Sequence, residues 1–316
     1  MTSKPRKGPA LHAGSAPRTT STRTVSSSGA ELWVGERGDA AAPTVVLVHG
    51  FPDTHRVWDE VSELLAERFH VVAYDVRGMG SSTAPDAKNG FTLGQLALDL
   101  EAVLDAVSPA RPAHLVGHDW GAFQCWEALA GERRHSRIAS FTAVAGPRID
   151  DVRAWALRRL RHPSPASLGR LAGQARRSWY VAAAQLPRLP ELALRRGFER
   201  AWPAALRRLE RVEPRPGHPA PTLSSDALTG LALYRTNMRR LRRDGEPVPA
   251  EVPVQLIVPT RDRYISPALY ADAERWAAQL WRRDIRAGHW VQRSHPHAVA
   301  RHVAELVEHA EGGPER

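Results

Sequence analysis

The pentapeptide Gly117-His118-Asp119-Trp120-Gly121 places a carboxylate where covalent chemistry is feasible. It joins a predicted strand to a predicted helix, and two glycines around one central residue are typical of a sharp turn with close backbone approach. A carboxylate there can attack a saturated carbon and leave an alkyl ester on the protein, whereas a serine would favour acyl transfer. Aspartate is also a favoured helix N-cap, so the pentapeptide alone leaves a structural role open.

The segments around this turn alternate between strands and helices. Apolar runs rich in β-branched residues predict strands at 44–49, 70–75, 113–117, 138–145, 254–258 and 284–287. Apolar residues at helical spacing predict helices at 58–69, 93–107, 121–131, 267–279 and 296–311. From about 148 to 249 arginine-rich amphipathic stretches replace this pattern. The sequence therefore predicts an α/β fold, with a mostly parallel sheet, helices on both faces and an inserted helical cap.

In this order, the segments resemble the α/β-hydrolase superfamily and, within it, the epoxide hydrolase family, especially the hydrolase part of actinobacterial members. The resemblance extends over about 23–307 and rests on the turn at 117–121, the loop His49-Gly50-Phe51-Pro52 and the tripeptide Gly288-His289-Trp290. Basic residues among Ser, Thr, Pro and Gly predict a disordered tail at 1–22. The resemblance and the interrupted pattern imply an α/β-hydrolase core at 23–147 and 250–311 and a helical cap at 148–249. The resemblance also implies that an epoxide is opened with water to a vicinal diol through an ester on Asp119.

The resemblance assigns further roles in the core. His289 would be the base that takes a proton from water, and Asp262 would orient it. The backbone N–H groups of Phe51 and Trp120 would form an oxyanion hole. Relatives also use an acid after the strand predicted at 138–145. Asp150 and Asp151 are the nearest acids there, and both lie too far into the cap.

Two tyrosines of the predicted cap are expected to activate the epoxide. Tyr180, followed by Gln185-Leu186-Pro187, resembles the first cap-tyrosine motif of epoxide hydrolases, and Tyr234-Arg235-Thr236-Asn237 resembles the second. Neutral phenols can hydrogen-bond to the ring oxygen as it takes up negative charge. The expected substrate pocket is lined by Trp120, Trp179 and Trp290.

Two other functions compete with epoxide hydrolysis. Haloalkane and haloacid dehalogenases share the aspartate nucleophile, but haloalkane dehalogenases often carry Asn where this chain has Phe51. Haloacetate dehalogenases carry Arg where this chain has Trp120. A non-catalytic binding protein on the same fold is the third hypothesis, and it would leave Asp119 unreactive.

Composition limits the partners. The net charge is +10, but 21 Arg and 8 acidic residues fall between Arg148 and Asp244, so we interpret the excess as a solvated helical surface and expect no nucleic acid. The sequence contains no run of about 18 apolar residues, so it predicts no membrane span. The single cysteine, Cys125, fits a cytoplasmic location. No metal or organic cofactor is implied. The expected partners are a small epoxide and water, for a monomer or homodimer.

Overall fold

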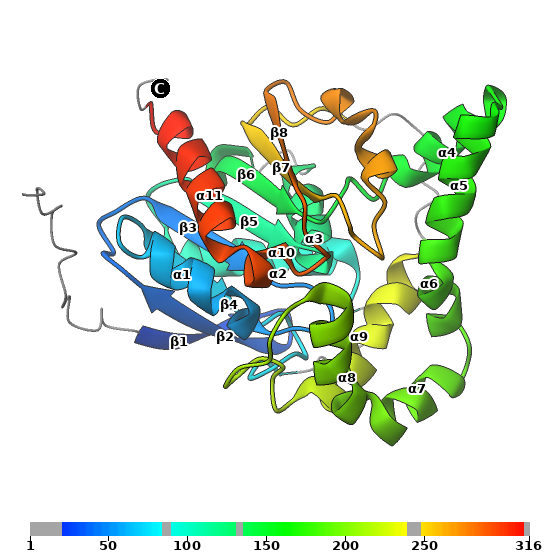
Figure 1. Ribbon diagram of the computed structural model, residues 1–316. Helices are drawn as coiled ribbons and strands as arrows, with labels where there is room; N and C mark the ends of the chain where they lie inside the picture. Colours follow the sequence, from blue (N-terminus) through cyan, green and yellow to red (C-terminus); the bar gives the residue numbers. More distant parts are fainter. Residues whose placement is uncertain (1–20, 84–89, 131–134, 239–247, 313–316) are drawn as a thin grey trace, which may run out of the picture.

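The computed structural model describes residues 21–83, 90–130, 135–238 and 248–312, and the strands in these ranges form one sheet (Figure 1). The strand order is β1-β2-β4-β3-β5-β6-β7-β8. The pairs from β4 and β3 through to β8 are parallel, whereas β2 is antiparallel to both β1 and β4. The strands are β1 Ser21–Ser27, β2 Ala30–Arg37, β3 Thr44–Val48, β4 His70–Tyr74, β5 Ala113–His118, β6 Ile138–Val144, β7 Val254–Pro259 and β8 Leu280–Ile285.

Helices cover both faces of the parallel strands, as Figure 1 shows. α2 and α3 pack together on one face, and α1 and α11 pack together on the other. Every residue of β3 is buried: Val46 and Val48 join the first apolar core, and Val45 and Leu47 join the second. This alternation follows from the two-residue period of a strand that is covered on both sides. The helices of these layers are α1 Asp59–Leu65, α2 Leu93–Val107, α3 Trp120–Leu129, α10 Val291–Ser294 and α11 Pro296–Ala310.

Between β6 and β7 the chain leaves the sheet, and its described residues there form helices without a regular strand (Figure 1). We call residues 151–237 the inserted helical segment. Three of its helices, α5, α7 and α8, bury none of their residues, which indicates that the segment packs loosely. Its elements are α4 Asp151–Arg161, α5 Pro165–Arg177, α6 Trp179–Ala184, α7 Leu189–Ala193, η3 Leu194–Phe198, α8 Glu199–Ala205, η4 Leu206–Glu210 and α9 Leu223–Asn237.

The predicted and observed elements differ at the start of the chain and around β8. Residues 1–20 of the expected tail lie outside the described residues, but Ser21 and Thr22 already belong to β1. The helix predicted at 267–279 is two short 3-10 helices, η5 Pro267–Tyr270 and η6 Ala273–Arg275, and the last strand begins earlier than predicted, at Leu280. β8 is an edge strand, and its exposed Arg282 and Asp284 hide the apolar signal by which buried strands are recognised.

The hairpin of β1 and β2 was absent from the sequence prediction. Ser28 and Gly29 connect the two strands, and both have positive φ, at 43° and 80°. Such a two-residue turn matches the twist of antiparallel strands. Within the described residues, no helix is long and apolar enough to cross a membrane.

Candidate active site

Four loops at the carboxyl ends of parallel strands supply the core part of the site. Phe51 follows β3, Asp119 follows β5, Asp262 follows β7 and His289 follows β8. Parallel strands end at the same edge of a sheet, so residues far apart in the chain meet there. This edge brings together all the core residues to which the sequence analysis assigned chemistry.

Asp119 occupies the strained turn that its two glycines predict. Its φ of 51° and ψ of −120° lie in a region that residues with a Cβ rarely adopt. A Cβ on Gly121 would lie 2.2 Å from the carbonyl oxygen of Val48, and a Cβ on Gly117 would lie 2.6 Å from that of Gly121. Both positions therefore require glycine, and the turn projects the Asp119 side chain beyond the strand end.

The Asp119 carboxylate is buried but not fully neutralised. Its Oδ2 accepts a hydrogen bond from the Phe51 N–H at 3.0 Å. Burial raises the pKa of Asp119 to about 6, although the nearby His289 and the backbone N–H groups of Trp120 and Phe51 oppose this shift. Oδ2 is thus held by the Phe51 N–H, and the other oxygen, Oδ1, faces His289.

His289 bridges the two carboxylates. Its Nδ1 lies 2.7 Å from Oδ2 of Asp262, and its Nε2 lies 3.8 Å from Oδ1 of Asp119. The other Asp262 oxygen accepts from the N–H groups of Tyr264 and Ile265, at 2.7 and 2.9 Å, which fixes this carboxylate. Burial disfavours the imidazolium, but the charge and hydrogen bond of Asp262 outweigh burial and raise the pKa of His289 to about 9.

The alternative acids lie elsewhere. The Asp151 carboxylate accepts from the Trp276 indole N–H and from Arg158, and Asp150 pairs with Arg148. No hydrogen bond or ion pair joins either of them to His289, whereas Asp262 lies at its Nδ1.

The two tyrosines of the inserted helical segment face each other beside the turn that carries Asp119. Tyr180 lies on α6 and Tyr234 on α9, and their rings meet edge to face with centroids 5.8 Å apart. The Tyr234 ring also contacts Trp120 at 5.0 Å and Phe51 at 5.3 Å. Burial raises both tyrosine pKa values well above the usual 10, and the negative charge of Asp119 adds to the shift. Both phenols therefore stay protonated and can donate hydrogen bonds.

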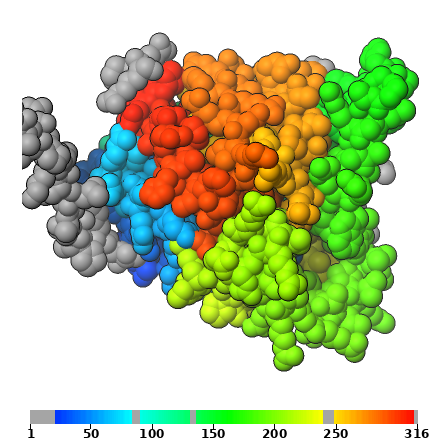
Figure 2. Space-filling model, in the orientation of Figure 1, coloured from blue at the N-terminus to red at the C-terminus, as the bar shows by residue number. Residues whose placement is uncertain are grey.

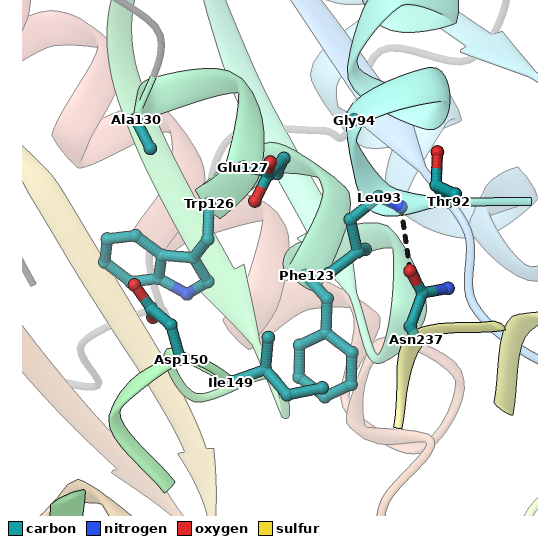
Figure 3. A pocket seen from close by; sticks show the side chains of 10 residues that line it. All are labelled: Thr92, Leu93, Gly94, Phe123, Trp126, Glu127, Ala130, Ile149, Asp150 and Asn237. Carbon is teal, nitrogen blue, oxygen red and sulfur yellow. Dashed lines mark hydrogen bonds between the residues drawn. The ribbon is translucent and has the colours of Figure 1, made fainter. Parts of the chain in front are cut away.

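The neighbours of Tyr234 anchor its helix. Arg235 donates to the carbonyl oxygens of Ala184 and Leu186, which ties α9 to the end of α6. The Asn237 side chain accepts from the Leu93 N–H at 2.9 Å, as the dashed line in Figure 3 shows, and donates to the Phe91 carbonyl oxygen. The Tyr-Arg-x-Asn stretch thus joins the inserted helical segment to the start of α2.

The three tryptophans expected around the pocket do not share one environment. Trp120 and Trp290 are each 2% exposed, and the Trp290 indole N–H donates to Asp53 at 2.7 Å. Trp179 is 69% exposed, so in this structure it does not line the buried part of the site. Trp179 directly precedes Tyr180 on α6. Successive residues of a helix point in different directions, and only Tyr180 turns inward.

Two contacts of His289 were missed by the sequence analysis. The Tyr264 ring lies 5.1 Å from the imidazole and 5.6 Å from the Tyr180 ring, so it also lines the site. Glu210, at the end of η4, is 4% exposed, and its Oε2 accepts the His289 backbone N–H at 2.7 Å. Tyr264 could have been found from its place two residues after Asp262. Glu210 gives no such signal, because an acid within an arginine-rich helix looks like a surface residue.

A hollow of about 230 Å³ lies next to the site, because Phe123, one of its lining residues, also contacts the Trp120 ring at 5.3 Å. Figure 3 shows that Phe123 and Trp126 of α3, Ile149, Asp150 and the start of α2 surround it. None of the predicted site residues lines it. Among the described residues, no group of three or more His, Cys, Asp or Glu side chains is arranged to hold a metal ion.

Curated relatives resemble this chain over unequal lengths. The probable oxidoreductase EphD of Mycobacterium tuberculosis is 39% identical over 294 residues, which cover 91% of this chain but 49% of that protein. This chain therefore spans about half the length of that relative. Epoxide hydrolase A of the same organism is 40% identical over 128 residues, covering 40% of this chain and 39% of that protein.

Solved structures share the fold. Epoxide hydrolase VrEH1 from Vigna radiata superposes with a TM-score of 0.72 at 21% identity, covering 93% of this chain and 99% of that one. An epoxide hydrolase from Bacillus megaterium gives 0.71 at 22% identity, covering 90% and 100%. Residues 43–296 match the family model described as the alpha/beta hydrolase fold. The strand order and the sharp turn at Asp119 agree with this family match. The chain belongs to the α/β-hydrolase fold family.

Proposed function

We propose that this protein is an epoxide hydrolase that opens an epoxide to a vicinal diol through an ester on Asp119. The observation that carries the proposal is the pairing of this buried carboxylate with two neutral phenols, Tyr180 and Tyr234, held beside it. The relatives and solved structures named as epoxide hydrolases support the same reaction.

In the first step Asp119 Oδ1 is the nucleophile, because Oδ2 is already engaged by the Phe51 N–H. Oδ1 attacks a ring carbon, a new C–O bond forms, and the C–O bond of the strained ring breaks. The ring oxygen takes the electron pair and receives a proton from a tyrosine hydroxyl. The two phenols lower the barrier because their hydrogen bonds strengthen as charge develops on this oxygen.

In the second step His289 takes a proton from water, and the hydroxide attacks the Asp119 carbonyl carbon. Negative charge appears on Oδ2, where the N–H groups of Phe51 and Trp120 stabilise it. The bond from the carbonyl carbon to Oδ1 then breaks, and Oδ1 leaves as one hydroxyl of the diol. As it leaves, Oδ1 takes the proton held by His289. The proton that remains on the new Asp119 carboxyl group passes to the tyrosinate, which restores the ionised carboxylate and the neutral phenol.

The protonation states of Asp119 and His289 favour ester formation first and ester hydrolysis second. At neutral pH Asp119, with a pKa of about 6, is ionised, and His289, with a pKa of about 9, is protonated. The negative charge of Asp119 is one cause of the raised pKa of His289. Ester formation removes that charge, so the pKa of His289 falls once a base is needed.

The domain roles follow from this scheme. We assign the core at 23–147 and 250–311 to the nucleophile, base and acid. The segment at 148–249 serves as a cap that brings the electrophile-activating phenols over them. The pocket would be lined by Trp120, Trp290 and Tyr264 in place of the exposed Trp179.

The test is a single turnover with excess enzyme in water enriched in oxygen-18. Because Oδ1 is transferred to the product, the first diol should carry no heavy oxygen, and Asp119 should become labelled instead. Heavy oxygen in the first diol would overturn the ester route. Asp119→Asn should lower diol formation by about a thousandfold or more. Halide release from haloalkanes by the unchanged enzyme, without epoxide turnover, would support the dehalogenase alternative.

A further inference from the structure

A second hollow, distinct from the proposed catalytic site, is surrounded by arginine side chains. Its cavity volume is about 500 Å³, and it lies where η4 meets the loops that follow β7 and β8. In Figure 2 the yellow-green part of the chain that carries η4 adjoins the orange and red part on the face turned to the viewer. Five exposed arginines line it: Arg208, Arg211, Arg261, Arg263 and Arg286.

The three core arginines of this hollow, Arg261, Arg263 and Arg286, lack the partners that the other described core arginines have. None of the five makes a hydrogen bond or ion pair through its guanidinium with another described residue. Every other described arginine outside the inserted helical segment has a contact of this kind or another interaction. In the described core, unpaired guanidinium groups therefore gather at this hollow, through Arg261, Arg263 and Arg286.

Glu210 is the only acid among the described residues that line the hollow, so five guanidinium groups face one carboxyl group. Its Oε2 is occupied by the His289 backbone N–H, and its side chain is buried. Burial raises the pKa of Glu210, although the charges of His289 and Arg263 oppose this shift. Converging positive charges at a concave surface create a local potential that attracts anions.

The shape of the hollow points to a small ligand. Its volume falls in the range of about 300–1,000 Å³ that is usual for small-molecule sites. Single-stranded nucleic acids need aromatic rings on which bases stack, and no Phe, Tyr or Trp is among the lining residues. Guanidinium groups match phosphate oxygens in pairs, and several such groups together favour a ligand with more than one negative charge.

We propose that this hollow is a binding site for a small molecule that carries a pyrophosphate or an equivalent pair of phosphate groups. Arg208 and Arg211 of the inserted helical segment and Arg261, Arg263 and Arg286 of the core supply the contacts. The ligand bridges the two parts of the chain directly behind the His289 loop, since Gly288 also lines the hollow. The site is independent of the proposed epoxide chemistry and can be tested without any epoxide.

The experiment is calorimetric titration of the full chain with inorganic pyrophosphate at physiological ionic strength, where charges more than about 8 Å apart are screened. The double variant Arg208→Gln/Arg286→Gln removes one guanidinium from each wall. The matched control, Arg196→Gln/Arg200→Gln, removes two exposed arginines that do not line the hollow. We expect saturable binding that weakens about tenfold or more in the wall variant and by less than about twofold in the control.

Three outcomes would overturn the proposal. The first is no saturable binding by the unchanged protein, and the second is equal weakening in the two variants, which would indicate nonspecific attraction to the whole positive surface. The third is binding of phosphatidylglycerol vesicles through these arginines without binding of pyrophosphate. That result would show that the surface contacts lipid headgroups instead of a small ligand. Thermal melting of both variants checks that the exposed substitutions leave the fold intact.

Discussion

The core and the inserted helical segment position their parts of the site by different means. In the core, strand ends, close glycine contacts and hydrogen bonds from main-chain N–H groups place Asp119 and Asp262, and His289 is held by Asp262. In the inserted helical segment, Tyr180 and Tyr234 depend on side-chain contacts such as those of Arg235 and on helices with few buried residues.

The inserted helical segment also exposes more large apolar side chains than the core does. Of ten large apolar side chains that are exposed in the described structure, eight lie in the inserted helical segment. The comparison indicates that the nucleophile and base sit on the more rigid region, and the groups that activate the epoxide sit on the less firmly packed one. Ester formation, which uses both regions, should therefore respond to changes in either, whereas ester hydrolysis should depend on the core.

The largest expected effect comes from the core. His289→Gln removes the base and leaves Asp119 and both tyrosines in place, so the ester should form and then persist. Steady-state turnover should fall by about a hundredfold to ten-thousandfold. Intact mass measurement after mixing with an epoxide should find one covalent adduct per chain, located at Asp119. Full turnover by this variant would contradict the role of His289.

The second effect separates the two regions. Tyr180→Phe or Tyr234→Phe should each slow ester formation by about a hundredfold, because a donor to the ring oxygen is lost. Ester hydrolysis should change by less than about threefold, since the core groups are untouched. Rapid mixing with acid quenching resolves the two steps.

Tyr270→Phe is the matched control for those variants. Tyr270 is buried near Trp276, and its hydroxyl has no hydrogen-bond partner among the described residues. Both steps should be unchanged in this variant. Equal slowing of both steps in Tyr180→Phe and Tyr234→Phe would mean that the inserted helical segment acts on the whole site.

The third effect is a pH dependence that differs between the steps. Ester formation needs ionised Asp119, so its rate should fall about tenfold per pH unit below about 6. Ester hydrolysis needs neutral His289, so its rate should rise with pH towards a limit set below about 9, because the ester no longer carries the Asp119 charge. Stopped-flow measurement across pH checks both. An ester-formation limb near pH 4, the ordinary range of aspartate, would contradict the influence of burial.

The smallest effect concerns the contact that joins the regions at His289. Glu210→Ala removes the acceptor of the His289 backbone N–H and should lower kcat by up to about tenfold, with KM unchanged. Glu210→Gln keeps a side-chain oxygen as acceptor, and its kcat should stay within about twofold. Both variants should lower the pKa seen in ester hydrolysis, because the Glu210 charge helps to raise that of His289. An unshifted pH profile would reduce Glu210 to a purely structural role.

The sequence predicted best what local backbone rules determine. The strand–turn–helix pattern with two glycines located Asp119, and the order of strands brought Phe51, Asp262 and His289 to the same edge. It predicted least what depends on distant packing. Glu210 meets a main-chain N–H 79 positions away in the chain, and the exposure of Trp179 depends on how α6 rotates against its neighbours.

The two outer strands of the sheet have a consequence for self-association. β1 exposes Ser21, Thr22, Arg23 and Thr24, and β8 exposes Arg282 and Asp284. An unprotected outer strand offers free N–H and C=O groups to the strand of another molecule, which is a common route to edge-to-edge aggregation. Charged side chains at both margins oppose that pairing, so we expect any dimer of this chain to form through its helices.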